Sequence, residues 1–276
     1  MAGPMNLRLA VLSLLIAPTW CTADYEVLKA DDNNAAAPAV RTQAILPDAG
    51  GPPNAFGHAN GYEAVFANAA PHFRVLGPLG GTPCHKRVKT SVTAKAAGCQ
   101  WATNAAPFNM SNGDCDDGFA ISNGVTFGTG GWKVQIGVTA DGSWVVGTLN
   151  ESVVASLNLT NSVNGFGWLV RGGAVVVGQD TYRAPRTTVG VTKDGRLLSL
   201  EVDGCEPGSG CLFPLGNTTH EMATLLAARG AYHAINLDGG GSSAVVADGK
   251  VIDHPTDMDR WILRKERAVT SIVCVL

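Results

Sequence analysis

The sequence lacks the features of several common protein classes. Charged residues make up only 16% of its 276 residues, and 20 basic against 23 acidic residues leave a formal net charge of −3. This balance gives no electrostatic footprint for nucleic acid. Beyond the N-terminus no apolar stretch is long enough to cross a bilayer, so no membrane span is expected. The 45% hydrophobic content is instead typical of a globular protein with an ample core.

Several catalytic and cofactor motifs are also missing. The chain has no G-x-S-x-G elbow, no H-E-x-x-H motif, no phosphate-binding G-x-x-x-x-G-K-[ST] loop and no dinucleotide fingerprint. Its cysteines show no C-x-x-C spacing, which disfavours zinc. The acidic run at 114–117 offers hard oxygens for a divalent cation, but it lacks the spacing of a calcium loop and is interpreted as solvated. We therefore expect neither a metal nor another cofactor.

The first 23 residues have the pattern of a secretory signal peptide. Arg8 supplies positive charge, Leu9 to Ala17 form the apolar region, and Cys21-Thr22-Ala23 provide small residues for cleavage. A membrane anchor is the weaker alternative, because the apolar run is too short to span a bilayer. The pattern predicts the secretory pathway, with the Golgi, the lysosome lumen and the extracellular space as open destinations.

The cysteines and glycosylation sequons agree with an oxidising compartment. Loss of Cys21 with the signal leaves six cysteines, an even set for disulfides. Only Cys205–Cys211, which closes a small Pro/Gly loop, can be paired from proximity alone. The N-x-[ST] sequons predict glycosylation at Asn109, Asn150, Asn158 and Asn217.

Turn residues between short β-branched runs predict an α+β fold in which antiparallel sheet dominates. The 34 glycines indicate a turn-rich chain. Asp-Gly or Gly-Gly turns separate pairs of β-branched runs, which is the strongest short-range hairpin signal. We expect largely antiparallel or mixed sheets built from such hairpins, with a few flanking helices. The predicted hairpins span residues 135–146, 168–177, 189–202 and 244–252.

Two flanking helices are expected, at about residues 87–97 and 217–229. The first range contains no helix breaker before Gly98. In the second, Thr218 and Glu221 have the spacing of a capping box. Three apolar residues at helical spacing form its predicted buried stripe, namely Met222, Leu225 and Leu226.

The same patterns suggest how the chain is divided. Residues 24–70 are rich in Ala, Asn, Asp, Pro and Gly without periodicity, and we interpret them as an irregular arm or a pro-segment. Patterned segments begin at about residue 71. Residues 71–276 are therefore predicted to form one functional domain.

The most informative stretch is residues 234–243, where a short apolar run ends at Asp238 and three glycines and two serines follow. Glycine has no Cβ, so its backbone N–H can closely approach a ligand. A tight hairpin with a capping aspartate is the plainer alternative. Three glycines exceed what a two-residue turn needs, so we predict a site centred on Asp238.

Two further segments carry groups suited to a sugar phosphate. Arg186, at the mouth of a predicted strand, has a planar guanidinium that matches phosphate, although a solvated arginine is the plainer alternative. The second segment contains His254, Asp257, Trp261 and Arg267. Trp261 would stack on a sugar ring, while a simply packed tryptophan and an inactive surface histidine are the alternatives.

The order of these motifs resembles the phosphodiester glycosidase family. Arg-Thr-x-x-Gly precedes a hairpin and a helix, Asn-Leu-Asp-Gly-Gly-Gly-Ser follows, and a Pro-x-Asp loop and Arg-x-Val close the series. The resemblance covers about residues 73–275. It implies a hydrolase that removes N-acetylglucosamine from a phosphate on mannose, exposing mannose 6-phosphate for lysosomal targeting.

Matched residue by residue, the resemblance implies roles for individual side chains. We assign Arg186 and Arg267 to the phosphate, and Asp238 to water activation or oxocarbenium stabilisation. The family also implies the disulfides Cys84–Cys115 and Cys99–Cys274. Substrate contacts are implied for Asn104, Thr187, Asn236, Gly239, Gly240, Ser242 and Asp257.

One segment departs from the family pattern. The family's Asn-Gly-Gly is replaced by Asn104-Ala105-Ala106-Pro107-Phe108, which adds two Cβ atoms and removes the N–H of Pro107. Two other functions therefore stay open: a non-catalytic secreted sugar-phosphate-binding protein, and a phosphodiesterase that cuts the other P–O bond. All three would act on a sugar-phosphate diester on a glycan.

Overall fold

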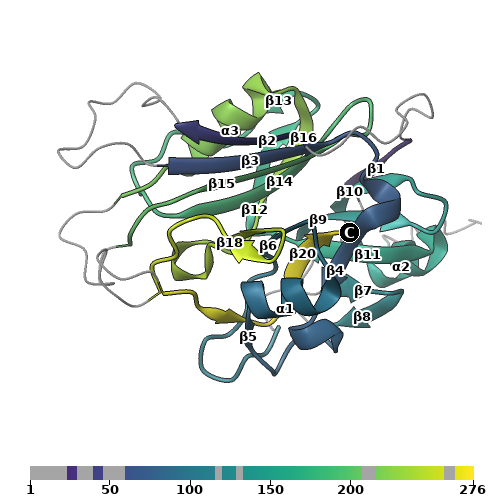
Figure 1. The fold of residues 1–276 in the computed structure, drawn as a ribbon. Coiled ribbons are helices and arrows are strands. Elements are labelled where there is room, and N and C mark those ends of the chain that lie inside the picture. The colour runs from purple at the N-terminus through teal and green to yellow at the C-terminus, as the bar shows by residue number, and fades with distance from the viewer. Residues whose placement is uncertain are drawn as a thin grey trace, which may run out of the picture.

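The fold is built from antiparallel β-sheets, as the hairpin pattern predicts (Figure 1). Within the described residues the chain forms four sheets and three α-helices, and every pairing between named strands is antiparallel. The predicted α+β class is therefore confirmed. The computed structural model describes residues 24–29, 40–45, 60–115, 120–128, 133–206, 215–257 and 265–276.

Seven strands form the largest sheet. In spatial order they are β13 (Ala174–Val175), β12 (Gly167–Arg171), β16 (Ala231–Asn236), β14 (Arg186–Thr192), β15 (Leu197–Val202), β3 (Asn60–Phe66) and β2 (Val40–Ile45). The hairpins β12–β13 and β14–β15 confirm two predicted hairpins. Strand β16 lies between them and pairs with both β12 and β14. The strand that leads to Asp238 is thus a central one.

The other sheets contain the two remaining predicted hairpins, β9–β10 and β17–β18. The six-stranded sheet contains β1 (Asp24–Leu28), β10 (Trp144–Thr148), β9 (Val134–Thr139), β11 (Leu159–Asn164), β7 (Ala120–Ser122) and β8 (Val125–Phe127). The five-stranded sheet contains β18 (Lys250–Val251), β17 (Val245–Ala247), β6 (Trp101–Asn104), β20 (Ile272–Val275) and β4 (Phe73–Leu76). A two-stranded sheet pairs β5 (Val88–Lys89) with β19 (Ala268–Val269).

Two of the three α-helices are the predicted ones. The helices are α1 (Thr90–Ala97), α2 (Glu151–Leu157) and α3 (Thr219–Ala228), with short 3-10 turns at η1 (Ala70–His72), η2 (Pro78–Gly80) and η3 (Gly240–Ser242). Helix α1 begins later than expected because the two residues before it pair as β5 with β19. The capping box of Thr218 and Glu221 is present in α3. Sequence reasoning missed α2, which at seven residues is too short to show a periodic apolar stripe.

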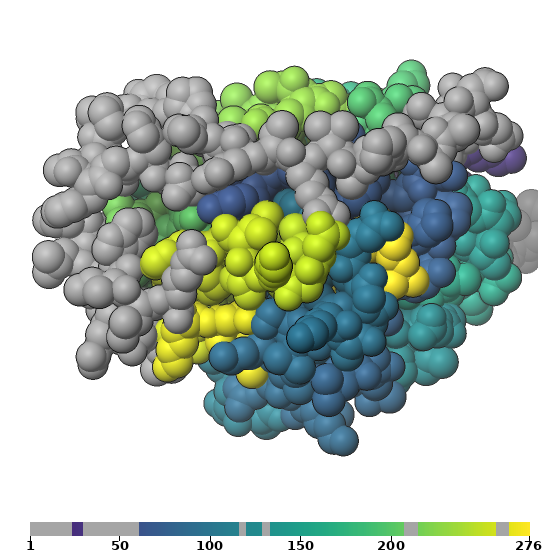
Figure 2. All heavy atoms as spheres, viewed as in Figure 1, coloured from purple at the N-terminus to yellow at the C-terminus, as the bar shows by residue number. Residues whose placement is uncertain are grey.

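The helices cover two different sheets. Figure 1 shows α3 beside the seven-stranded sheet and α1 beside the five-stranded sheet. The predicted stripe of α3 is confirmed, because Met222 and Leu226 are fully buried against that sheet and Leu225 is partly buried there. The face in Figure 2 shows the yellow-green β17–β18 region lying against the blue region of α1. Both helices thus close one sheet face against solvent.

A single apolar cluster joins the three large sheets. Ile235 of the seven-stranded sheet, Ile136 of the six-stranded sheet and Val273 of the five-stranded sheet all belong to it. The indole N–H of the buried Trp101 donates to the Ser199 hydroxyl at 3.0 Å, so this polar group is satisfied inside the core. The contact also fixes strand β6 opposite strand β15.

The segment expected to be irregular, residues 24–70, includes three strands. Strand β1 pairs with β10, β2 pairs with β3, and β3 pairs with β15 along its whole length. The irregular interpretation is wrong for these strands. Main-chain hydrogen bonds to an existing sheet edge need no particular side-chain pattern, so composition gave no signal for them. Removal of this segment as a pro-segment stays a prediction.

Some predictions fall outside the described residues. These are the signal peptide at 1–23, Asp116 and Asp117 of the acidic run, Cys211, and Trp261. Within the described part of the chain, no helix combines the length and the apolar character that crossing a bilayer requires.

Candidate active site

The loop after β16 is fastened to two neighbouring strands. The N–H of Asp238 donates to the carbonyl of Ala105 at 3.0 Å, just beyond β6. The N–H of Gly240 donates to the carbonyl of Pro185 at 2.9 Å, just before β14. A Cβ on Gly239 would lie 2.9 Å from that same carbonyl oxygen, so the loop approaches β14 too closely for a side chain. Asp238 is therefore held where the five-stranded and seven-stranded sheets meet.

The side chain of Asn104, at the end of β6, holds this loop by hydrogen bonds. Its side-chain amide donates to the carbonyl of Asp238 at 2.7 Å, and its Oδ1 accepts from the Thr187 hydroxyl at 2.7 Å and from the N–H of Ala244 at 3.3 Å. Asn104 and Thr187 have no exposed surface. Both were expected to contact substrate. In the structure both are buried and their polar groups hold the loop, and their contact with substrate stays a prediction.

The carboxyl group of Asp238 combines burial with several polar neighbours. Burial raises its pKa to about 6, while hydrogen bonding from the Ser242 hydroxyl, the charge of Arg267 and the N–H of Gly239 act in the opposite direction. The Gly239 N–H lies 3.0 Å from Oδ1. The charge of Glu206 adds to the rise in pKa. A carboxyl group with a pKa near 6 exchanges a proton near neutral pH, which suits acid–base catalysis.

Arg267 binds directly to the glycine loop. Its Nη1 donates to the Ser242 hydroxyl at 3.1 Å, and its Nε donates to Asp257 Oδ1 at 2.7 Å. The loop that holds Asp257 is fastened nearby, because the Asp257 N–H donates to the carbonyl of Lys265 at 2.8 Å. A Cβ on Gly241 would lie only 2.3 Å from Arg267 Nη2. Glycine at 241 therefore lets the guanidinium lie against the backbone.

Arg186, the first residue of β14, is held on the other side of the loop. Its Nε donates to the carbonyl of Asn217 at 3.2 Å and its Nη2 to the carbonyl of Tyr182 at 3.0 Å. Its guanidinium carbon lies 5.7 Å from the centre of the Tyr182 ring, within range of a cation–π contact. Burial lowers the pKa of Arg186 from its ordinary value, and the charges of Asp180 and Glu206 oppose that change.

Sequence reasoning missed Glu206, which connects the two arginine-containing parts of the site. Its carboxylate influences the ionisation of both Asp238 and Arg186. Its Oε1 lies 3.5 Å from the Tyr182 hydroxyl, and a Cβ on Gly240 would lie 2.2 Å from its Oε2. The only sequence signal was its position beside Cys205, in the loop whose disulfide was predicted from proximity.

Asn236, the last residue of β16, is the remaining predicted substrate contact. It is only 5% exposed, and its Oδ1 has no hydrogen-bond partner among the described residues. An orphaned buried acceptor is costly, so its presence two residues before Asp238 marks a polar position close to the site.

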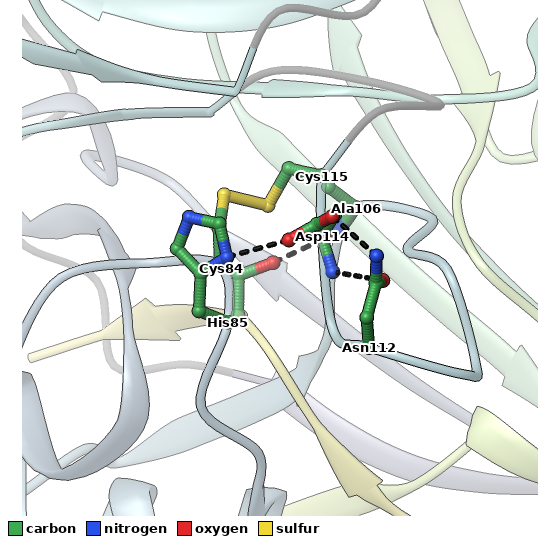
Figure 3. The surroundings of a disulfide bond; sticks show 7 residues. Cys84, His85, Ala106, Asn112, Asp114 and Cys115 are labelled. Atoms are coloured by element: carbon green, nitrogen blue, oxygen red, sulfur yellow. Dashed lines mark hydrogen bonds and ion pairs between the residues drawn. A yellow bond between two sulfur atoms is a disulfide. The ribbon is translucent and has the colours of Figure 1, made fainter.

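Two disulfides stabilise the surroundings of the site. Cys99–Cys274 joins the end of α1 to β20, and Cys84–Cys115 closes the segment that follows Asn104, so both pairings implied by the family resemblance are confirmed. Figure 3 shows Cys84–Cys115 beside the His85–Asp114 ion pair, whose atoms lie 2.5 Å apart. Cys205 is also disulfide-bonded, and Cys211, its predicted partner, lies outside the described residues.

The predicted glycosylation sites differ in accessibility. Asn158 is exposed, and Asn109 and Asn150 are partly exposed. Asn217 is only 8% exposed, and its carbonyl accepts a hydrogen bond from Arg186. Glycosylation at the four sequons stays a prediction.

The segment that departs from the family pattern lies inside the core. Ala105 and Ala106 are 1% and 2% exposed and belong to the central apolar cluster. The carbonyl of Ala105 accepts the Asp238 N–H, and the N–H of Ala106 donates to the Ser271 hydroxyl at 3.2 Å. The two added Cβ atoms are thus accommodated by packing, and the backbone still supports Asp238.

Comparison with known proteins supports the resemblance. Residues 97–276 match the family model described as phosphodiester glycosidase. The N-acetylglucosamine-1-phosphodiester alpha-N-acetylglucosaminidases of Mus musculus and Bos taurus are 30% and 31% identical to the chain over 74% of its length. The chain spans only 43% and 42% of those two proteins.

The fold is also similar to a solved structure. The zebrafish N-acetylglucosamine-1-phosphodiester alpha-N-acetylglucosaminidase catalytic domain, auto-inhibited by its pro-peptide, matches with a TM-score of 0.75 and 25% identity, covering 92% of this chain and 88% of that chain. A hypothetical protein from Synechocystis matches in fold alone, with a TM-score of 0.55 and 16% identity over 86% of this chain and 62% of that one. With a family model that covers well over half of its residues, the chain belongs to the phosphodiester glycosidase family.

Proposed function

We propose that the protein hydrolyses a sugar-phosphate diester of the N-acetylglucosamine-phospho-mannose type, releasing the sugar and exposing a phosphomonoester. The observation that carries this proposal is the contact series Asp238–Ser242–Arg267, in which a carboxyl group with a raised pKa lies beside a guanidinium on a glycine loop. The names of the mammalian relatives and of the zebrafish structure supply the substrate class.

The two arginines are assigned to the phosphate. Arg267 uses two of its five N–H donors for Asp257 and Ser242, and Arg186 uses two for backbone carbonyls. Such anchoring fixes the orientation of each guanidinium before substrate arrives, which is what electrostatic stabilisation of a reacting phosphate requires. The Gly239–Gly241 loop adds backbone N–H groups.

Asp238 is assigned to the attacking water. The leaving phosphate monoester has a second pKa of about 6, so it departs with little help from an acid. The water oxygen attacks C1, the C1–O bond breaks with its electrons passing to the phosphate oxygen, and Asp238 accepts the proton. Glu206, whose charge acts on Asp238, is the second carboxylate of the site. A covalent sugar intermediate on Asp238 is the alternative, and it would retain the configuration that direct attack by water inverts.

Product analysis in oxygen-18 water tests the reaction. The purified chain is incubated with N-acetylglucosamine-phospho-mannose, and the products are examined by mass spectrometry. We expect free N-acetylglucosamine carrying the label and unlabelled mannose 6-phosphate. N-acetylglucosamine 1-phosphate as a product would support the phosphodiesterase alternative. Saturable binding without any release would support the non-catalytic alternative.

The substitution Asp238→Asn tests the role of the carboxylate. Removing a general base is expected to lower kcat by about 10²- to 10⁴-fold. Asp141→Asn is the matched control, because Asp141 is an exposed turn residue in the β9–β10 hairpin. Full turnover by the Asp238→Asn variant would refute the assignment.

A further inference from the structure

Tyr182 is an exposed aromatic residue beside the candidate active site. It is 51% exposed, its hydroxyl lies 3.5 Å from Glu206 Oε1, and its ring centre lies 5.7 Å from the guanidinium carbon of Arg186. Single exposed apolar residues are ordinary on protein surfaces and need no explanation. Tyr182 differs from them because the side chains that it contacts, Glu206 and Arg186, both belong to the candidate site.

The segment that carries Tyr182 is fastened on both sides of the ring. Asp180 Oδ2 accepts from the N–H of Thr219 at 3.0 Å, at the start of α3. Both Nη atoms of Arg183 donate to the carboxylate of Glu221, at 3.0 and 2.5 Å. The N–H of Tyr182 itself donates to Asp180 Oδ1 at 3.1 Å. The backbone therefore defines where the ring is presented before a ligand arrives, which lowers the entropy cost of binding.

Two side chains connect the glycine loop to Tyr182. Glu206 faces Gly240 with its Oε2, which a Cβ on that glycine would overlap, and it reaches the Tyr182 hydroxyl with its Oε1. The Cα of Arg186 lies 3.9 Å from the position of a Cβ on Gly239, and its guanidinium lies at the Tyr182 ring. Tyr182 is thus separated from the glycine loop by the length of these two side chains.

A diester of two sugars has to occupy both sides of its phosphate. In the proposed reaction, the sugar whose C1 is attacked lies at Asp238, and the phosphate binds Arg186. The second sugar is joined to the phosphate through the other ester oxygen, so it extends beyond Arg186 to the side on which Tyr182 lies. The faces of a pyranose ring carry C–H groups, and these pack well on the electron-rich face of an aromatic ring.

We propose that Tyr182 is the binding platform for the second sugar of the diester, the mannose of a glycan, which stacks on the ring while its phosphate binds Arg186. This inference rests on the proposed function and deepens it, because it names a residue that determines specificity for the group on the far side of the phosphate. Sequence reasoning placed such stacking at Trp261, which lies outside the described residues, and did not single out Tyr182.

Two diesters that differ only in the second group test the proposal. One is N-acetylglucosamine-phospho-mannose, and the other is the corresponding methyl phosphodiester, which lacks the second sugar. The quantity measured is the ratio of their kcat/KM values. Tyr182→Ala is expected to lower this ratio by about 5- to 10-fold, through KM for the mannose diester, as the loss of one aromatic contact would do. The substitution keeps the backbone carbonyl of residue 182, which accepts from Arg186.

Two further variants assign the effect to the ring. Tyr182→Phe keeps the aromatic face and removes only the hydroxyl near Glu206, so it is expected to keep the ratio of the wild type. Val176→Ala is the matched control, because Val176 is a 50% exposed apolar residue six positions earlier, and it is also expected to keep the ratio. The Tm of each variant reports whether the fold is intact.

Equilibrium binding separates this inference from the proposed hydrolysis. In the Asp238→Asn background, where turnover is expected to be slow, isothermal titration measures the Kd of each diester. The mannose diester is expected to bind about 5- to 10-fold more tightly than the methyl diester, and adding Tyr182→Ala should remove this difference. The measurement needs no sugar release, so it tests the platform even if the wild type releases none.

Three results would overturn the proposal. An equal loss for both diesters in Tyr182→Ala would mean that the ring acts only by holding Arg186. A ratio that falls as far in Tyr182→Phe as in Tyr182→Ala would assign the effect to the hydroxyl instead of the ring face. Equal or unmeasurable binding of the two diesters with Tyr182 intact would mean that no second sugar binds there. A preserved difference in Kd without any sugar release would refute the hydrolase activity alone.

Discussion

Two groups of acids, close to the same pair of sheets, differ in their charged neighbours. Asp238 has a hydroxyl, a backbone N–H and the Arg267 guanidinium to offset its burial, and its pKa rises only to about 6. Burial raises the pKa of Glu201 well above its ordinary value, and its charged neighbours Asp203 and Asp253 raise it further. The first arrangement can exchange a proton near neutral pH. The second strongly disfavours the ionised form of Glu201.

The comparison shows why burial alone does not identify a catalytic carboxylate. Desolvation acts on both groups, but only the partners decide which charge state is populated. A catalytic acid or base is left with a small free-energy difference between its two states. A buried carboxyl group beside other carboxylates is left with a large one. Three experiments sharpen this distinction.

The largest effect is expected from removing the positively charged partner of the glycine loop. Arg267→Met takes away a group proposed to bind the phosphate and leaves Asp257 without its ion pair. We expect kcat/KM to fall by about 10²- to 10³-fold and the free energy of unfolding to fall by about 3 kcal/mol. Assays of sugar release and chemical denaturation measure the two quantities.

A double variant separates these two effects. Adding Asp257→Asn to Arg267→Met removes the uncompensated carboxylate, so much of the lost stability should return while activity stays low. Recovery of activity in the double variant would show that Arg267 acts only through Asp257 and not on the phosphate.

A smaller effect is expected on stability from Asp238→Asn, and it depends on pH. The folded-state pKa of about 6 exceeds the ordinary value of 3.8, so ionised Asp238 disfavours the folded state. Its favourable contribution is complete below about pH 4 and is lost as the pH rises through 6. Relative to wild type, the variant should therefore gain about 2–3 kcal/mol between pH 4 and pH 7.5. Denaturation curves at both pH values check this, and parallel behaviour of the two proteins would contradict it.

The smallest effect is expected from a methyl group at Gly240. Its φ is +57°, and a Cβ there would overlap the carboxylate of Glu206. Gly240→Ala should displace Glu206 and lower kcat/KM about tenfold. Gly249→Ala is the matched control, because its φ is +72° and its Cβ would meet only Lys95 Cγ at 3.9 Å. Both variants carry a similar backbone cost of about 1 kcal/mol, but only the first should lose activity. Equal activities would exclude a role for the contact between Gly240 and Glu206.

Local patterns predicted much of the fold. The four hairpins and the cap of α3 depend on neighbouring residues, so turn glycines and the Thr218–Glu221 spacing were sufficient. Strands β1 and β2 were missed because they form by adding to sheet edges, and α2 was missed because it is too short to show a period.

The candidate site also combines residues that the sequence identifies with residues that only the fold brings in. Asp238, Ser242 and Arg267 lie in motifs that a reader of the sequence can find, and the structure brings them together. Asn104 and Thr187 are also in such motifs, and the structure shows that their buried polar groups support the loop, which the sequence did not indicate. Glu206 carries no motif and enters the site only because its segment folds over Gly240.

The sequence by itself determined the hairpins, the family and the identity of the acidic and basic groups at the glycine loop, because these depend on residues that are near one another in the chain. Only the tertiary structure decided which carboxylates lie beside a guanidinium and which lie beside other carboxylates. Ionisation depends on distances and burial in space, and β15 and the loop after β18, about fifty residues apart, meet only when the sheets pack.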